Sequence, residues 1–201
     1  MKKIFTLILL ISCLTSVKAF ENDYFTINIP DEYVDESKDN IYKWSKDNNY
    51  ISITITDNPN TYDISKYTDQ DLKDQKNYLN SIYSSGLQDY NMTVEVSDMT
   101  RKTINDYSIL TYDVYWPSEE LTGHNIFQKG AVYTTKNYIY TILVNSDKEI
   151  PEEEFNILLN SFNLKDEKIT DSGNLLIFII VCGTILGIIG YILDRKKKEH
   201  E

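Results

Sequence analysis

The sequence predicts an α+β domain in which helices pack on an antiparallel sheet, flanked by a signal peptide and one transmembrane helix. Three observations support this. Several segments alternate apolar and polar residues, two segments carry a helical apolar stripe, and twenty uncharged residues lie together near the C-terminus. Strands joined through short links, with helices kept separate, are typical of the α+β class.

Four segments alternate with a period of two, as half-buried strands do. Two further apolar segments follow, and Pro117 ends the segment before them. The polar link 135–137 predicts a hairpin turn between the last two segments. The six expected strands occupy residues 24–30, 50–56, 92–97, 109–116, 126–135 and 137–145.

The first expected helix covers residues 69–85. Thr68 is a good N-cap, and Asp71 is placed to complete a capping box. Gly86 supplies a stop signal. The predicted apolar stripe consists of Leu72, Leu79, Ile82 and Tyr83.

The second expected helix begins at Pro151, because proline suits the first helical position. Residues 152–154 are all glutamate, which favours a helix start through the helix dipole. The side chains expected to face the core are Phe155, Leu158, Leu159 and Phe162.

These elements resemble a known family. The opening strand Phe25–Pro30 reads FTINIP, the helix at 155–162 reads FNILLNSF, and between them lie a long helix and paired strands. This pattern is similar to the PsbP-like family, named for an extrinsic subunit of photosystem II. The resemblance covers residues 22–164. It implies a non-enzymatic domain that binds or stabilises partners, with no catalytic residues to carry over.

Residues 1–19 are expected to form a secretory signal peptide. Lys2 and Lys3 precede an apolar core at 4–14, and cleavage after Ala19 fits the small residues there. Two alternatives remain open: lipidation at Cys13, since residues 10–13 loosely resemble a lipobox, or an uncleaved N-terminal anchor.

Residues 174–193 predict a transmembrane helix, since twenty helical residues span about 30 Å. The basic run 195–198 places the tail, 194–201, in the cytoplasm by the positive-inside rule. Residues 165–173 form a polar stalk between the exported domain, 20–164, and this helix. The alternative is sortase anchoring at 169–173, a stretch that lacks the proline of the usual signal.

Two glycines in this segment, Gly183 and Gly187, have the spacing of a helix-packing face in membranes. They are the one pair of site residues that the sequence suggests, although glycine is common in such helices without that role.

The exported part is strongly acidic. Residues 20–173 hold 28 Asp and Glu against 13 Lys and Arg, a net charge of −15. That balance argues against a nucleic-acid partner and against lying flat on anionic lipid. The same residues contain no cysteine, so thiolate metal sites and disulfides are excluded there.

The sequence carries no distinctive catalytic motif. His124 is the single exported histidine, and the sequence holds no GxSxG, phosphate-binding glycine loop or EF-hand pattern. A weak calcium site is left open among five scattered aspartates, Asp35, Asp39, Asp47, Asp69 and Asp71.

Aromatic residues crowd the first half of the exported part, either as a binding surface or as cover for the core. They are Tyr24, Tyr33, Tyr42, Trp44, Tyr50, Tyr62 and Tyr67.

The sequence therefore predicts a single-pass type I membrane protein that presents a small acidic, non-catalytic binding or scaffold domain outside the cell membrane. Its expected partners are membrane lipid, through the C-terminal helix, and a protein of the cell envelope, with no nucleic acid, cofactor or metal. Two alternatives are a small envelope hydrolase with two carboxylates facing one cleft, about 5–10 Å apart, and a sortase-anchored surface protein.

Overall fold

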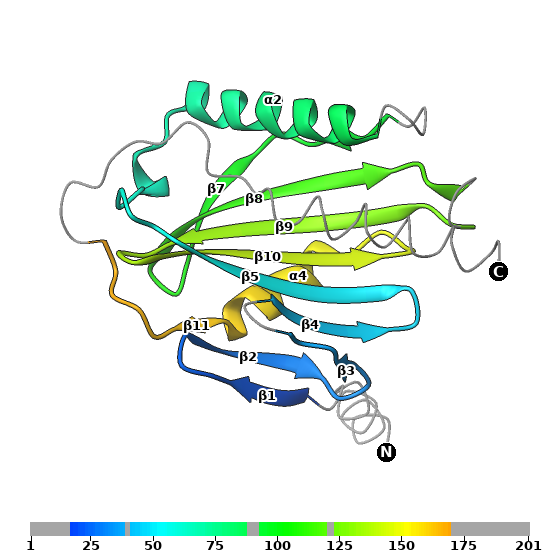
Figure 1. Cartoon of the computed structure of the whole chain (residues 1–201), viewed down its shortest axis with the longest axis horizontal. Helices are drawn as coiled ribbons and strands as arrows, with labels where there is room; N and C mark the ends of the chain where they lie inside the picture. The colour runs from blue at the N-terminus through cyan, green and yellow to red at the C-terminus, as the bar shows by residue number, and fades with distance from the viewer. Residues whose placement is uncertain (1–16, 39–40, 88–92, 120–122, 170–201) are drawn as a thin grey trace, which may run out of the picture.

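The computed structural model describes residues 17–38, 41–87, 93–119 and 123–169 (Figure 1). These residues form two sheets in which every strand pair is antiparallel. The small sheet has the order β1 (Val17–Glu21), β2 (Phe25–Pro30) and β11 (Asn163–Leu164). The large sheet has the order β3 (Val34–Asp35), β4 (Ile41–Lys46), β5 (Asn49–Asp57), β10 (Tyr138–Ser146), β9 (Ile126–Thr134), β8 (Tyr107–Trp116) and β6 (Glu95–Val96), and β7 (Thr100–Ile104) also pairs with β8.

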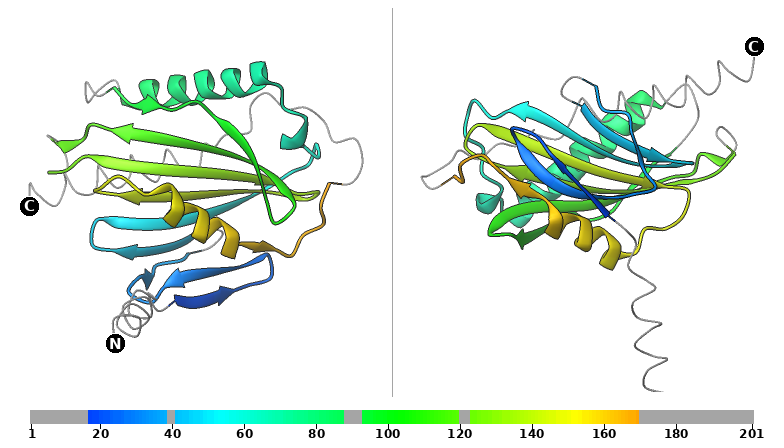
Figure 2. Two further views of the ribbon diagram at one scale, coloured as in Figure 1. Left: turned by 180° about the vertical axis from the view of Figure 1, so that it is seen from behind. Right: turned by 90° about the horizontal axis from the view of Figure 1, so that it is seen from below.

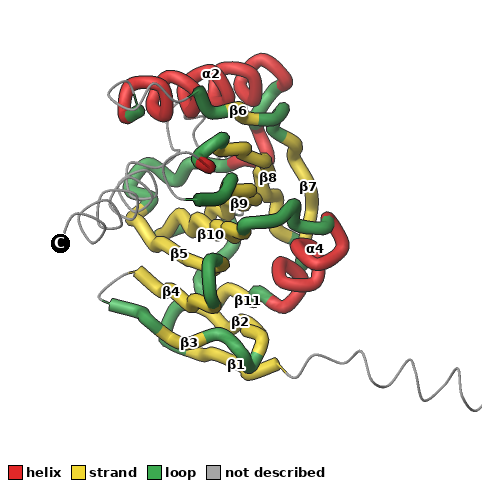
Figure 3. Tube along the Cα trace, turned by 90° about the vertical axis from the view of Figure 1, so that its right-hand side faces the viewer, coloured by secondary structure: helices red, strands yellow, loops and turns green. Residues whose placement is uncertain are grey.

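The large sheet is covered on both faces. Helix α2 (Asp69–Gly86) and the 3-10 turn η1 (Ile64–Lys66) pack on one face. Helix α4 (Glu152–Ser161) and the small sheet pack on the other (Figures 2 and 3). Alternate residues of β8 point into the two cores, with Leu110 and Val114 under α2 and Ile109 on the α4 side. The predicted α+β class, with an antiparallel sheet packed by helices, is confirmed.

Both predicted helices are present, with ends within one residue of expectation. At α2, Thr68 and Asp71 form the predicted capping box, in which the Thr68 N–H donates to Asp71 Oδ2 at 2.7 Å. Gly86 is the last residue of that helix. Pro151 is the N-cap of α4 rather than its first helical residue. The predicted hairpin turn at 135–137 joins β9 to β10.

The number of strands was underpredicted. Strands β1, β3, β4, β7 and β11 were not predicted, and the strand expected at 92–97 is described only as the two residues of β6. Two of the missed hairpins turn on Asp47 and on Asn105-Asp106, which adopt positive φ values of 52°, 50° and 64°. Asn and Asp tolerate this backbone region. The Asn and Asp residues at these positions were therefore sequence signals that could have predicted the two tight turns.

The predicted ends of the chain lie largely outside the described residues. This holds for residues 1–16 of the signal peptide, Cys13, Gly183, Gly187, the helix at 174–193 and the tail at 194–201. The last three residues of the predicted signal peptide, 17–19, belong to β1 and pair with β2. Among the helices of the described residues, none is long and apolar enough to cross a membrane.

The predicted stalk is described as far as residue 169, and its first part contacts the domain. The Lys165 N–H donates to the Tyr24 carbonyl at 2.9 Å, and the Lys165 ammonium lies 2.7 Å from Glu21. Asp166 accepts hydrogen bonds from the Thr135 hydroxyl and from the Asn137 side-chain amide, the latter at 2.7 Å. The chain is therefore tied to the β9–β10 hairpin before it continues beyond residue 169.

These contacts set the charge of Asp166. Partial burial acts to raise its pKa, but the hydrogen bonds from Thr135 and Asn137 outweigh burial and lower the pKa below its usual value. A carboxylate with a lowered pKa stabilises the fold at pH values above its unfolded pKa of about 3.9. That contribution is lost as the pH falls through the lower, folded-state value.

Close packing at the centre of the sheet depends on one glycine. The Tyr112 ring lies directly over Gly130, its partner across the β8–β9 ladder. A Cβ atom at residue 130 would stand 2.3 Å from Tyr112 Cζ, well inside van der Waals contact. Since Tyr112 is 3% exposed, its ring has little room to move away. The sheet therefore requires glycine at this position.

We expect Asp166→Ala to lower the free energy of unfolding at pH 7 by about 1–2 kcal/mol, because the buried Thr135 hydroxyl and the exposed Asn137 amide lose their acceptor. The difference from the unaltered protein should shrink below about pH 4, where protonation weakens the same contacts. Urea unfolding between pH 3 and 7 measures it. Glu167→Ala is the matched control, since the exposed Glu167–Lys136 ion pair should contribute little. Equal losses for both variants at every pH would contradict the assignment.

We expect Gly130→Ala to lower the free energy of unfolding by about 1–3 kcal/mol through overpacking. In a Tyr112→Leu background the same change should cost less, because the ring it collides with is gone. Chemical denaturation of the four proteins gives the coupling. Strict additivity of the two substitutions would show that the contact does not restrict residue 130.

Candidate binding groove

A cavity of about 430 Å³ forms a groove on the α4 face of the large sheet, beside the start of α4. It crosses β6, β8 and β9 and is closed by the connection between β10 and α4. Each of these elements contributes side chains because alternate residues of the strands face this side. The residues that give it its chemistry are Glu95, Tyr115, Phe127, Lys129, Glu149 and Ile150.

Two aromatic rings form part of the groove wall. Tyr115 and Phe127 are direct partners in the β8–β9 ladder, and their ring centroids lie 5.2 Å apart with the planes tilted by 44°. Both side chains are half-buried, whereas their strand neighbours Val114 and Gln128 are buried under α2. The pair thus sits where the sheet extends past the cover of α4 and keeps part of its aromatic surface accessible.

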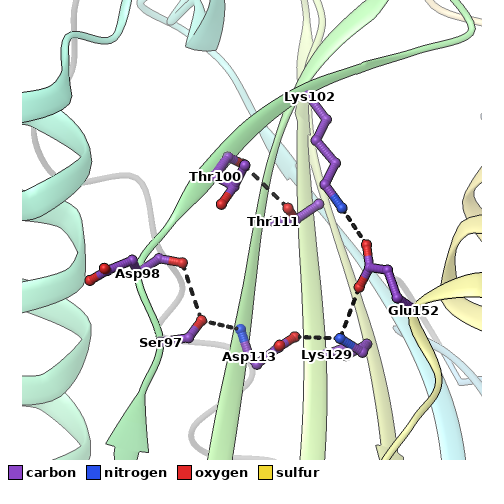
Figure 4. Close-up of polar contacts among 8 residues, drawn as sticks. All are labelled: Ser97, Asp98, Thr100, Lys102, Thr111, Asp113, Lys129 and Glu152. Atoms are coloured by element: carbon purple, nitrogen blue, oxygen red, sulfur yellow. Dashed lines mark hydrogen bonds and ion pairs between the residues drawn. The ribbon is translucent and has the colours of Figure 1, made fainter.

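A chain of ion pairs borders the groove. The Lys129 ammonium lies 2.9 Å from Asp113 and 3.0 Å from Glu152, and Glu152 also binds the Lys102 ammonium (Figure 4). These ion pairs connect β7, β8 and β9 to the first turn of α4. They therefore fix the position of α4 where the groove begins.

Burial and charge act in opposite directions on these groups. Burial alone would lower the pKa of Lys129, whose side chain is 11% exposed, but hydrogen bonds to Asp113 and Glu152 raise it above its usual value. The hydrogen bond from Lys102 is the main cause that lowers the pKa of Glu152. Both partners are therefore held in their charged forms near neutral pH.

Next to these ion pairs, a short segment that belongs to no strand separates β6 from β7. The Ser97 N–H donates to the Asp113 carbonyl at 2.9 Å, and the Asp113 N–H donates back to Ser97 Oγ at 2.8 Å. Thr111 Oγ1 donates to the Thr100 carbonyl at 3.3 Å where β7 begins (Figure 4). These bonds hold this segment against β8 and leave the Asp113 side chain at the groove.

The hydrolase alternative expects two neighbouring carboxylates, and Asp113 and Glu152 are such a pair, but Glu152 is held in its charged form. The Asp113 and Glu152 oxygens are at most about 6 Å apart, because each lies within 3.0 Å of the same Lys129 nitrogen. A glycosidase acid needs a raised pKa so that it stays protonated. Glu152 has a lowered pKa and two lysine partners. The arrangement therefore favours a structural ion pair over acid catalysis.

The other residues singled out from the sequence do not assemble into a site. His124 lies in the β8–β9 connection, where its carbonyl accepts the Ser118 hydroxyl at 2.9 Å, and it does not line the groove. Asp35 accepts the Ser37 N–H, and Asp47 forms the β4–β5 turn. Asp39 falls outside the described residues. Over the part of the chain that is described, no three His, Cys, Asp or Glu side chains group as a metal site would require.

The aromatic residues of the first half serve the cores. Trp44 and Tyr67 are buried, and the other five are partly buried against one of the two cores. The half-buried aromatic pair that belongs to neither core is instead Tyr115–Phe127, which was not predicted from the sequence. Its signal was present: both residues fall on the face of their strands opposite to Val114 and Gln128, at positions where a half-buried strand is expected to carry polar residues.

Comparison with solved structures identifies the fold. The chain is similar to cyanobacterial PsbP (CyanoP) from Synechocystis, with a TM-score of 0.55 and 12% identity over 75% of this chain and 94% of that one. A protein of Bacteroides thetaiotaomicron matches with a TM-score of 0.49 and 12% identity over 75% of this chain and 49% of its own. No protein-family model and no curated protein sequence matches. The chain thus has a PsbP-like fold, as its motifs predicted.

We expect Lys129→Met to lower the free energy of unfolding by about 1 kcal/mol, since it leaves Asp113 and Glu152 without their shared cation while both keep water. Lys46→Met is the control, because its ammonium lies 3.4 Å from Glu32 on the exposed surface. Urea unfolding measures both. A double-mutant cycle with Glu152→Gln should show coupling. Equal effects of the two lysine variants, with no coupling to Glu152, would contradict the stabilising role of these ion pairs.

Proposed function

We propose that this PsbP-like domain is a non-catalytic binding or scaffold module, presented outside the cell membrane by a single-pass type I protein, and that a protein partner docks in the groove. The groove's Tyr115–Phe127 pair carries this proposal. The large aromatic residues elsewhere in the sheet are used to fill the two cores. These two rings instead line a cavity of about 430 Å³, a size within the range of ligand sites.

The energetic case follows from the exposed aromatic surface. Tyrosine and phenylalanine bury large areas at interfaces, and interface energy concentrates in such anchors when they are surrounded by polar residues that exclude water. Here the rings lie next to Ile150 and are bordered by Glu95, Glu149 and Lys129. An apolar centre with a charged rim is the usual anatomy of a protein interface.

The rigidity of the groove supports binding rather than chemistry. Its walls include β8 and β9, each of which pairs with strands on both sides, and the ion pairs of Lys129 hold the start of α4 in place. A preformed surface loses little entropy when a partner docks. The PsbP-like fold agrees with a non-catalytic role, because the resemblance supplies no catalytic residues.

The membrane part of the proposal comes from the sequence. Residues 174–193 are uncharged and are followed by the basic run 195–198, which is the pattern of a stop-transfer helix. Such a tether would confine the domain near the membrane and raise its effective concentration toward partners held at the same surface.

We expect a photo-reactive benzoyl-phenylalanine in place of Phe127 to crosslink one specific envelope protein in intact cells after illumination. Detergent extraction, copurification and mass spectrometry identify it and show whether residues 174–193 are still attached. The same label at Asp57, at the opposite end of the sheet, is the control. Equal capture from both positions would argue against docking in the groove. A wall-linked product that lacks the helix would support sortase anchoring instead.

A further inference from the structure

The charge of the groove defines what can bind there. The exposed side chains of Glu95 and Glu149 lie at its rim, and neither forms an ion pair with another described residue. The Asp113 side chain is 57% exposed beside them. Lys129 is the groove's one cation among the described residues. The groove thus carries an excess of two negative charges.

That lysine is not available to a ligand. Its side chain is only 11% exposed, and its ammonium is already shared between Asp113 and Glu152. It also lies 5.9 Å from the centroid of the Phe155 ring, on the α4 side. An anionic ligand would therefore meet carboxylates without a free counter-charge.

The aromatic rings and the carboxylates together select one chemistry. A neutral apolar ligand would cover the rim carboxylates without pairing them, and removing water from unpaired charges is costly. A cation on an apolar stem avoids this, because its stem packs on the rings and its head meets a carboxylate. The faces of Tyr115 and Phe127 also attract a cation through their ring quadrupoles.

The dimensions favour a segment of polypeptide. The groove crosses β6, β8 and β9, and neighbouring strands lie about 4.8 Å apart, so it spans roughly 10 Å. An extended chain covers about 3.3 Å per residue, which makes this distance equal to about three residues. One basic residue with apolar neighbours would fill the length between its walls.

We propose that the groove recognises an arginine or lysine side chain, flanked by apolar residues, on an extended segment of a partner protein. The aliphatic stem lies against Tyr115 and Phe127, and the charged head binds Glu95 or Glu149. This inference rests on the proposed role of the groove as a docking site and names the chemistry of its partner. The negative charge of the domain would thus act at one place, the groove, where carboxylates lie next to an apolar wall.

The test is selection of random nonapeptides displayed on phage against the full chain in neutral detergent micelles. We expect the selected peptides to be enriched in arginine or lysine next to apolar residues. The best peptide is then synthesised with arginine or with citrulline, which has the same shape without the charge. Fluorescence anisotropy should show binding of the citrulline form to be about tenfold weaker or more, equivalent to one lost charge interaction.

Matched variants locate the effect. Glu95→Gln with Glu149→Gln should weaken binding of the arginine peptide about tenfold and leave the citrulline peptide unchanged. Asp57→Asn should alter neither. Since Glu95 and Glu149 are exposed, unfolding curves should be unchanged, which separates lost recognition from lost folding.

Two results would overturn the inference: selection of acidic or uncharged peptides or of none, or equal affinity for the arginine and citrulline forms. Failure here remains distinct from failure of the proposed function. Specific crosslinking from residue 127 in cells, combined with either result, would keep the groove as a docking site and reject the basic residue. Absence of both crosslinking and selection would reject the groove itself.

Discussion

The whole architecture depends on the burial of one sheet from both sides. Strands β8, β9 and β10 must send alternate side chains into two different cores, one under α2 and one under α4 and the small sheet. A shift of one residue in any of these strands would exchange the two sets of side chains. The contact between Tyr112 and Gly130 helps to fix the register, because a ring fits there only where its partner lacks a side chain.

The groove is a consequence of incomplete cover on one of those faces. The ten residues of α4 shield the middle of the sheet, and the small sheet shields the part nearest β4. What remains beyond the first turn of α4 is the end of the β8–β9 pair, where the two cores no longer need apolar side chains on both sides. The chain places a buried lysine, two aromatic rings and several carboxylates there. The candidate site and the fold are therefore set by the same feature, the limited length of α4.

Much of this fold could be read from the sequence, because the signals are local. The capping box of Thr68 and Asp71 and the alternation in β8 each depend on a few neighbouring residues. The short edge strands were missed since pairing with a distant strand defines them: β11 is two residues long and β7 reads TRKTI. The groove could not be predicted from the sequence for the same reason. Lys129, Glu152 and Tyr115 come from three elements, and only the assembled sheet brings them together.

The small sheet has a mechanical consequence. Strands β1 and β11 both pair with β2 and run parallel to each other, so residue 17 and the residues after 164 leave β2 at opposite ends. Tension between the two ends of the domain would load these strands in shear, along their length, where the hydrogen bonds share the force. The hydrogen bonds of Asp166 to Thr135 and Asn137 would pass part of that load to the turn between β9 and β10. A domain pulled from both ends would thus be loaded at the small sheet and at the 135–137 turn, which lies at the end of the β9 strand away from Phe127 and the groove.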